Sequence, residues 1–256
     1  MSKELEVAVR AAKKAGERLE EHFETILELH EKEDKSFVTK ADLEAEKIII
    51  EAIQKEFPSH QILSEEAGLV GKRSDDVWVV DPLDGTNNFT RGIPIFATSI
   101  ALTNKKETIM AVVYNPITNT LFTSEKGKGA FWNREKIEVS DIDKVSEAVL
   151  SFSRGRDPDS RAKMLTHFDK VYPKIKSPRI LSSAALELAY IASGRLDAFI
   201  IQGINIWDFL GGLLLVQEAG GKVTTLDGKN WNLKSSQLLV TNGKIHDELL
   251  QIINSR

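Results

Sequence analysis

The stretch Val77-Trp78-Val79-Val80-Asp81-Pro82-Leu83-Asp84-Gly85-Thr86 carries more information about fold and function than any other part of the sequence. Its apolar start predicts a short strand buried on both faces, and Asp81 and Asp84 follow where that strand ends. Gly85 and Thr86 then predict a helix opening, whose first N–H groups can bind an anion. Carboxylates fixed at a strand end suit hard divalent cations, which take oxygen ligands. Either aspartate alone would more commonly cap a helix, but together they predict a site for metal and phosphate.

The composition of the 256-residue chain excludes several classes of function. The net charge is −4, and the Lys and Arg residues are dispersed among acids, which argues against nucleic acid as a partner. No apolar run approaches the roughly 20 residues that a membrane helix needs, so no membrane association is expected. The sequence has no cysteine, which excludes disulfides and thiolate metal sites and suits a cytoplasmic protein. Phosphorylated substrates would therefore have to be attracted by bound cations.

Hydrophobic periodicity predicts an α+β first half. Two amphipathic helices are expected over residues 4–29 and 41–57, the second stopped by Pro58. Strands are expected after them, the last three as an antiparallel meander, over residues 62–64, 77–80, 95–102, 109–114 and 121–124. The first lobe is expected to span residues 1–145 and to carry most of the metal ligands.

The second half, residues 146–256, alternates strands and helices as an α/β lobe does. Strands are expected over residues 149–153, 179–181, 196–201, 222–225 and 238–241. Helices are expected over residues 160–171, 184–192, 209–219 and 245–253, and the Gly220-Gly221 pair is typical of a helix end. No linker separates the halves, which predicts one compact unit.

Four sequence elements resemble the signatures of the inositol monophosphatases, which are magnesium-dependent, lithium-sensitive phosphatases related to fructose-1,6-bisphosphatase. They occur in family order over nearly the whole chain: Val38–Asp42, Ser64–Glu66, Asp81–Phe89 and Trp207–Asp208. The resemblance implies a five-layer αβαβα sandwich and, usually, a homodimer. It also implies Mg²⁺-dependent hydrolysis of a small phosphorylated metabolite, by direct in-line attack of a metal-activated water and with lithium as an inhibitor.

The resemblance implies two to three Mg²⁺ ions and their ligands. Glu65, Asp81 and the backbone carbonyl of Leu83 would hold the first ion. Asp81, Asp84 and Asp208 would hold the second, so that Asp81 bridges the two. Taken alone, Asp208 would be a helix cap and Glu65 an exposed acid at a strand end.

The catalytic roles implied by the resemblance fall on the same segments. Thr86 and Asp42 would orient and activate the attacking water, and a weaker third ion would lie between that water and Glu65. The N–H groups of Gly85 and Thr86 would hold the phosphate. Asp42 alone would be an ordinary acid in the first turn of a helix. All five histidines lie outside these motifs and are expected on the surface or at helix ends.

The substrate is less well specified. Members that bind inositol carry a Glu seven residues before the motif aspartate, where this chain has Ile201, which cannot hydrogen-bond a hydroxyl. Ser182, Ser183 and Ala184 are expected to line the substrate pocket together with Ile201, although Ile201 also suits an ordinary strand core. One candidate substrate class is inositol monophosphate or a related sugar or polyol phosphate. Histidinol phosphate, fructose 1,6-bisphosphate and a 3′-phosphonucleotide are alternatives.

Two other functions compete with this one. Haloacid-dehalogenase phosphatases carry a nucleophilic Asp in Asp-x-Asp-Gly-Thr, but two residues separate Asp81 from Asp84, which disfavours an aspartyl-phosphate intermediate. The other is a non-catalytic, metal-dependent scaffold on the same fold. Such a scaffold would be expected to have lost part of the site, yet every expected side chain is present: Asp42, Glu65, Asp81, Asp84, Thr86 and Asp208.

Overall fold

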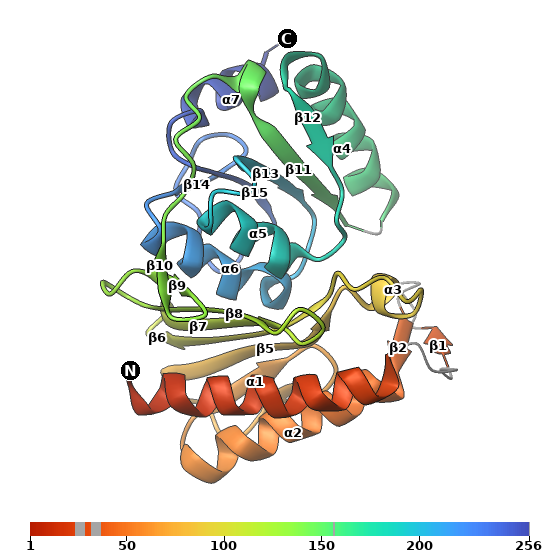
Figure 1. Cartoon of the computed structure of the whole chain (residues 1–256), viewed down its shortest axis with the longest axis vertical. Coiled ribbons are helices and arrows are strands. Elements are labelled where there is room, and N and C mark those ends of the chain that lie inside the picture. Colours follow the sequence, from red (N-terminus) through yellow and green to blue (C-terminus); the bar gives the residue numbers. More distant parts are fainter. Residues whose placement is uncertain (24–28, 32–36, 156, 256) are drawn as a thin grey trace.

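The computed structural model describes residues 1–23, 29–31, 37–155 and 157–255. The described chain forms five layers, helix, sheet, helix, sheet, helix (Figure 1), as the sequence resemblance predicts. The helices are α1 (Lys3–His22), α2 (Lys40–Glu56), α3 (Thr86–Phe89), α4 (Pro158–Val171), α5 (Ala184–Ala192), α6 (Ile206–Glu218) and α7 (His246–Ile253). Two short 3₁₀ turns lie at Val145–Glu147 and Tyr172–Lys174, and a separate two-stranded ribbon pairs β1 (Leu29–Glu31) with β2 (Phe37–Thr39).

The first large sheet has eight strands in the order β10-β9-β8-β7-β6-β5-β3-β4. Its strands are β3 (Gln61–Ser64), β4 (Gly68–Val70), β5 (Asp76–Asp84), β6 (Ala97–Asn104), β7 (Glu107–Asn115), β8 (Thr120–Glu125), β9 (Ala130–Trp132) and β10 (Glu135–Ile137). β6, β7 and β8 form the predicted antiparallel meander, and only the β3–β5 pair is parallel. This parallel pair brings residue 65 and the end of β5 to the same edge.

The second sheet has five strands in the order β12-β11-β13-β15-β14. Its strands are β11 (Val149–Arg154), β12 (Ser177–Arg179), β13 (Ala198–Gln202), β14 (Lys222–Thr225) and β15 (Gln237–Thr241). β11 pairs in parallel with β12 and β13, whereas β15 is antiparallel to both of its neighbours. The chain leaves the first sheet after β10 and enters the second at β11, so the boundary predicted near residue 145 falls in this connection.

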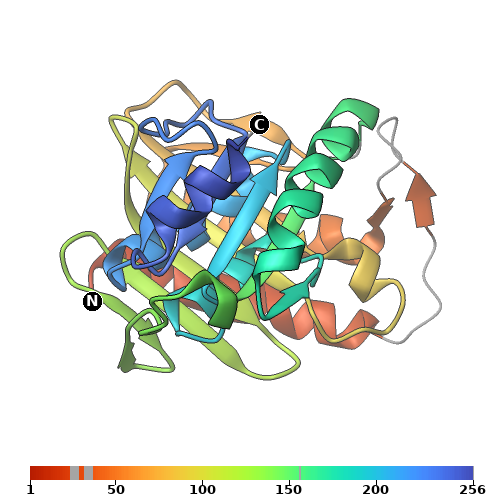
Figure 2. The same cartoon turned by 90° about the horizontal axis from the view of Figure 1, so that it is seen from above.

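Three apolar cores hold the layers together (Figures 1 and 2). One lies between the α1–α2 pair and the outer face of the first sheet, and includes Leu19, Ile49 and Trp78. The middle core surrounds α5 and α6 between the two sheets, and the third lies under α4 and α7. The α5–α6 layer is apolar on most sides because it contacts a sheet on both faces, as a fully buried helix must be.

The structure differs from the sequence-based prediction in several places. The first helix ends at His22 and not near residue 29, because the backbone is extended at Phe23 and residues 29–31 pair with β2 as a strand. Part of the predicted span, residues 24–28, lies outside the described residues. The strand predicted over 77–80 continues to Asp84, with a shift of register between Asp81 and Asp84. The short strands β4, β9 and β10 were not predicted.

Candidate active site

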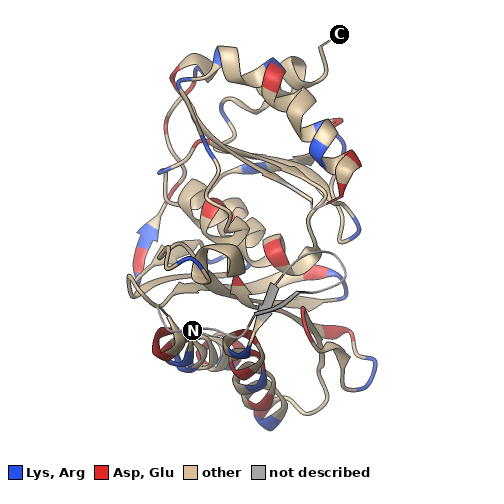
Figure 3. Ribbon diagram, turned by 90° about the vertical axis from the view of Figure 1, so that its right-hand side faces the viewer, with Lys and Arg blue, Asp and Glu red and all other residues tan. Residues whose placement is uncertain are grey.

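A cavity of about 750 Å³ lies where the two halves of the chain meet. Its lining comes from the carboxyl end of β5, the starts of α3, α5 and α6, and one side of α4. Charged residues of both signs are spread over the outer helices, and acidic positions also occur in the middle layer between the sheets (Figure 3). The acids that line the cavity are Glu65, Asp81, Asp84, Asp157 and Asp208.

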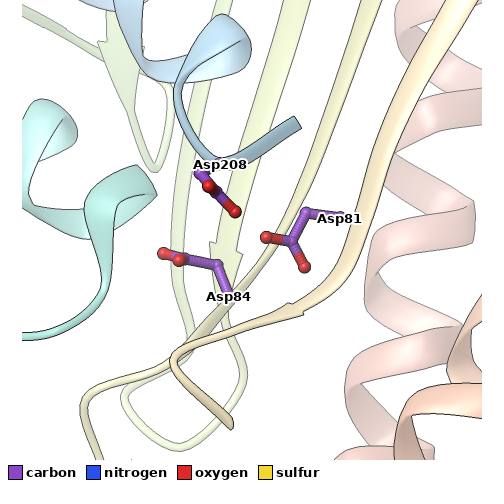
Figure 4. Close-up of side chains that lie close together, drawn as sticks. All are labelled: Asp81, Asp84 and Asp208. Atoms are coloured by element: carbon purple, nitrogen blue, oxygen red, sulfur yellow. The ribbon is translucent and has the colours of Figure 1, made fainter. Parts of the chain in front are cut away.

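Three of these carboxylates converge. Asp81, Asp84 and Asp208 each offer one oxygen, and the three oxygens lie within 4.8 Å of one another. Figure 4 shows the three side chains close together, those of Asp81 and Asp84 from the end of β5 and that of Asp208 from the start of α6. Asp208 follows the other two by 124 residues or more in the sequence, so folding brings distant positions together, as the resemblance predicts for a metal site.

Asp84 is held by the start of α5. Its carboxylate accepts hydrogen bonds from the Ser183 hydroxyl at 2.5 Å and from the N–H groups of Ala184 and Ala185 at 3.3 and 2.9 Å. These N–H groups have no partner within their own helix, and the helix dipole favours a negative charge there. Asp84 therefore joins the first sheet to the middle helical layer and is fixed in direction by the same bonds.

The other two carboxylates are also fixed by backbone donors. Asp81 accepts from the N–H of Leu83 at 3.0 Å, which holds the bulged end of β5. Asp208 accepts from the N–H of Asn205 at 2.7 Å as part of a capping box at the start of α6. The helix-cap role that the sequence suggests for Asp208 is therefore real, and it coexists with membership of the acidic cluster.

Burial and mutual repulsion disfavour the charged forms of these acids. Burial raises the pKa of Asp81 well above its usual range, and the charges of Glu65, Asp84 and Asp208 raise it further. Burial raises the pKa of Asp84 to about 7, although its hydrogen bonds from Ser183, Ala185 and Ala184 oppose the shift. A bound cation would reverse this balance by favouring the ionised carboxylates.

Glu65 lies at the edge of the cluster. It lines the cavity and raises the pKa of Asp81 through its charge, but its oxygens are not within the 4.8 Å group.

Glu46 on α2, a buried side chain absent from the predictions, holds the turn that follows β3. Its carboxylate accepts from the Ser64 hydroxyl and, at 3.0 Å each, from the N–H groups of Glu66 and Ala67. Glu46 thereby holds the segment that presents Glu65.

The structure brings together Asp42 and Thr86 from separate elements. The Thr86 hydroxyl lies 3.4 Å from one carboxylate oxygen of Asp42 and 3.1 Å from the carbonyl of Leu83. The other Asp42 oxygen accepts from the N–H of Thr39 at 2.9 Å in the capping box of α2. Burial raises the pKa of Asp42 to about 7 against these hydrogen bonds. The pair can therefore exchange a proton with a third group near neutral pH.

Gly85 must be a glycine at this position. Its φ is +96°, and an added Cβ would lie 2.9 Å from the carbonyl oxygen of Ile95. A larger residue would be strained both by the left-handed backbone and by this contact. Gly85 thus lets the chain turn from Asp84 directly into α3, which leaves Gly85 and Thr86 on the cavity wall.

The four residues predicted to bind substrate separate into two groups. Ser182 and Ala184 line the cavity. Ser183 is fully buried and its hydroxyl donates to Asp84, so it supports a carboxylate. Ile201 does not line the cavity: its side chain is fully buried in the middle core. The ordinary core interpretation of Ile201 is the one that fits the structure, because its face of β13 packs against the middle helical layer.

Besides Glu46, sequence reasoning missed one wall of the cavity and a buried acid outside its lining. One is the side of α4 that lines it, with Arg161, Met164, Leu165 and Phe168. Their spacing of three, four and seven residues marks one helix face, but only the tertiary structure shows what that face covers. The other is Glu187 on α5, whose pKa burial raises to about 8. Its carboxylate accepts from the Ser151 hydroxyl and from the N–H of Leu181 at 2.9 Å, which holds the segment before Ser182.

One histidine lies at a helix end, as predicted, but is not on the surface. His246 starts α7 but is fully buried, with its ring nitrogens 3.0 Å from the Thr224 hydroxyl and 2.9 Å from the Thr241 hydroxyl. It is distant in the chain from every cavity residue.

Among the described residues, every helix is too short or too polar to cross a lipid bilayer.

The donor set suits a hard divalent cation. All three convergent side chains offer carboxylate oxygens, two of them are buried, and burial raises the pKa of Asp81 and of Asp84. The described residues contribute no thiolate or imidazole to the cluster. Oxygen-only sites of this kind favour Mg²⁺, Ca²⁺ or Mn²⁺ over softer metals.

Comparison with known proteins gives a consistent assignment. The model of the inositol monophosphatase family matches residues 1–256. A fructose-1,6-bisphosphatase/inositol-1-monophosphatase of Thermotoga maritima is 38% identical over 98% of this chain and 95% of its own, and the Nus factor SuhB of Escherichia coli is 38% identical over 96% and 94%.

Solved structures agree with this. The extragenic suppressor protein suhB of Bartonella henselae superposes with a TM-score of 0.95 at 36% identity, covering 99% of both chains. The inositol monophosphatase of Anabaena superposes with a TM-score of 0.87 at 35% identity, over 97% of this chain and 94% of its own. With matching sequence and fold, this chain belongs to the inositol monophosphatase family of phosphatases.

Proposed function

We propose that the protein hydrolyses a small phosphate monoester in a Mg²⁺-dependent reaction, with water as the nucleophile. The observation that carries this proposal is the meeting of two groups at one cavity. The convergent carboxylates of Asp81, Asp84 and Asp208 line it, and so does Thr86, whose hydroxyl lies 3.4 Å from the buried carboxylate of Asp42. A charge-neutralising site beside a proton-accepting pair is what water attack on a phosphate ester requires.

The acidic cluster would hold the cations. Asp81, Asp84 and Asp208 would share one Mg²⁺, and Asp81 with Glu65 and the Leu83 carbonyl would hold another. Bound Mg²⁺ would neutralise the substrate phosphate and lower the pKa of water. The cavity lining supports bound cations, because it is rich in acids that would repel an anionic substrate if no cation were present.

The remaining roles fall on residues of this chain. The Thr86 hydroxyl would hold the attacking water and pass its proton towards Asp42, whose raised pKa suits a base near neutral pH. The N–H groups of Gly85 and Thr86, at the start of α3, would donate to the phosphate oxygens. The attack is direct, because the two-residue spacing between Asp81 and Asp84 disfavours an aspartyl-phosphate.

The substrate class rests on the relatives. Their names include inositol-1-monophosphatase and fructose-1,6-bisphosphatase, so inositol monophosphate and related sugar or polyol phosphates are the first candidates. Histidinol phosphate and 3′-phosphonucleotides remain alternatives with the same chemistry. We further propose that the protein is a cytoplasmic homodimer and that lithium inhibits it.

The test is a phosphate-release assay with and without Mg²⁺ over these substrates. We expect release that requires Mg²⁺, is inhibited by lithium and leaves no acid-stable phosphoenzyme. A trapped phosphoenzyme would instead support the haloacid-dehalogenase mechanism. Mg²⁺ binding by calorimetry without release from any substrate would support a non-catalytic scaffold.

A further inference from the structure

One face of α4 forms a wall of the cavity that the proposed reaction does not use. Arg161, Met164, Leu165 and Phe168 lie three, four and seven residues apart and all line the cavity. Leu165 is 67% exposed, and Ile180, which also lines the cavity, is 68% exposed. Large apolar side chains that stay exposed at a cavity are typical of a ligand contact.

Arg161 is the single basic residue among the described residues that line this cavity. No ion pair of the described residues includes it, whereas its neighbour Lys163 pairs with Asp159 at 2.6 Å. Asp157, one turn earlier, has a carboxylate oxygen engaged at 2.9 Å by the N–H of Ser160 as the helix cap. The guanidinium is thus placed on the wall, and no carboxylate of the described residues forms an ion pair with it.

The size of the cavity leaves room for a group at this wall. At about 750 Å³ it exceeds what a phosphate and a single small polyol fill, and it extends from the acidic cluster to α4. A guanidinium binds phosphate or carboxylate through parallel N–H donors. The acidic cluster repels a second anionic group unless cations are bound to it. Arg161 is positively charged and can bind such a group directly.

We propose that Arg161 binds a second anionic group of the substrate, so that the preferred substrates are phosphate monoesters carrying a further phosphate on an uncharged body. This inference rests on the proposed phosphatase function. The body lies against Leu165, Phe168 and Ile180, which suits a sugar ring face or a nucleoside. Arg161 is a specificity-determining residue and takes no part in the attack on phosphorus.

The experiment compares wild type and Arg161→Gln on two substrate pairs that differ only by the second phosphate. The pairs are fructose 1-phosphate with fructose 1,6-bisphosphate, and adenosine 3′-phosphate with adenosine 3′,5′-bisphosphate. We expect Arg161→Gln to lower kcat/KM for the better bisphosphate by on the order of 10- to 100-fold, mainly through KM. The matching monophosphate should change less than about twofold. The pair that responds identifies the body as sugar or nucleoside.

Lys163→Gln is the matched control, because it removes one positive charge from the same helix but does not line the cavity. It should leave both ratios unchanged. Equal losses on the mono- and bisphosphate, or no loss on either bisphosphate, would overturn the inference while leaving the proposed function intact. If wild type hydrolyses none of the four compounds, the proposed function fails for them. Calorimetry in Mg²⁺ then measures bisphosphate binding by wild type and by Arg161→Gln. Weaker binding by Arg161→Gln supports the inference, and equal binding, or no binding by wild type, refutes it.

Discussion

Thr86 and Asp42 offer a test of the catalytic pair at the level of single side chains. Thr86→Ala removes the hydroxyl that lies 3.4 Å from Asp42, and Asp42→Asn removes the proton acceptor. Each should lower kcat by about 100-fold or more while KM changes little, since general-base catalysis is typically worth about 10²–10⁴-fold. Steady-state kinetics on the best substrate measures both constants.

Thr90→Ala is the control for this pair. Its hydroxyl is exposed and donates to the Asn87 carbonyl at 3.2 Å, close to α3 but away from Asp42. It should retain wild-type kinetics. If Thr86→Ala and Asp42→Asn mainly raised KM, the pair would bind substrate and would have no role in activating water.

Ile201 tests whether the substrate pocket reaches β13. The side chain is fully buried in the middle core, so Ile201→Glu should lower the free energy of unfolding by several kcal/mol, because an unpaired buried carboxylate is costly. Leu69→Glu, at a position 67% exposed, should be nearly neutral. Urea unfolding compares the two variants. An Ile201→Glu variant of wild-type stability with a new preference for inositol monophosphate would show that Ile201 faces substrate.

At the level of elements, His246 ties β14, β15 and α7 together in its neutral form. Burial lowers the pKa of His246 to about 4 from 6.5, the charge of Lys222 lowers it further, and Asp247 opposes the shift. The unfolded chain therefore binds the proton first. The stability due to neutral His246 is complete above about pH 6.5 and is lost as the pH falls towards 4, by on the order of 3 kcal/mol.

Urea unfolding of wild type and His246→Gln between pH 7 and 4 measures this contribution. Buried acids such as Glu187, with raised pKa values, act in the opposite direction in both proteins, so the difference isolates His246. The variant should be less stable at pH 7, and the gap should narrow as the pH falls. A gap that stays constant over this range would mean that His246 does not stay neutral in the fold.

For the whole molecule, the buried acidic cluster lowers stability when no cation is bound. The raised pKa of Asp81 means that the folded state resists its ionisation, so its unfavourable contribution grows as the pH rises above the usual range. Asp81→Asn should therefore raise the free energy of unfolding in EDTA at neutral pH, because it removes a buried charge that neighbouring carboxylates repel. Activity should be abolished.

Thermal unfolding in EDTA and in Mg²⁺ checks this prediction. Mg²⁺ should raise the Tm of wild type and raise that of Asp81→Asn much less, because binding to the folded state alone stabilises it. Asp197→Asn is an unsuitable control, because the Asp197 carboxylate accepts hydrogen bonds from the Ser140 hydroxyl and the Val149 N–H. Asp159 is exposed and gives the suitable control: Asp159→Asn should respond to Mg²⁺ as wild type does. Retained turnover in Asp81→Asn would count against its role as a bridging ligand.

Local rules predict the order of strands and helices and the first pair of acids, since Asp81 and Asp84 follow a buried strand at a fixed spacing. The five-layer arrangement and the roles of Glu65 and Asp208 are implied only by the family resemblance. What could not be predicted depends on packing between distant segments. Ile201 and its neighbours on β13 are apolar on both faces, so periodicity cannot tell core from pocket, and Arg161 on α4 becomes part of the cavity only through the position of its helix.

The bond between Asp84 and Ser183, 99 residues apart, has a consequence for synthesis on the ribosome. At about 5–20 residues per second, the partner of Asp84 appears roughly 5–20 s after it. The buried residues of the α1–α2 core lie between Leu5 and Tyr114, so the first sheet can form its outer layer in that interval. Its inner face, with Val79, Val113 and Phe122, stays uncovered until α5 and α6 emerge. The nascent chain therefore exposes an apolar sheet face for seconds, which makes this interval its period of greatest exposure to aggregation and to chaperones.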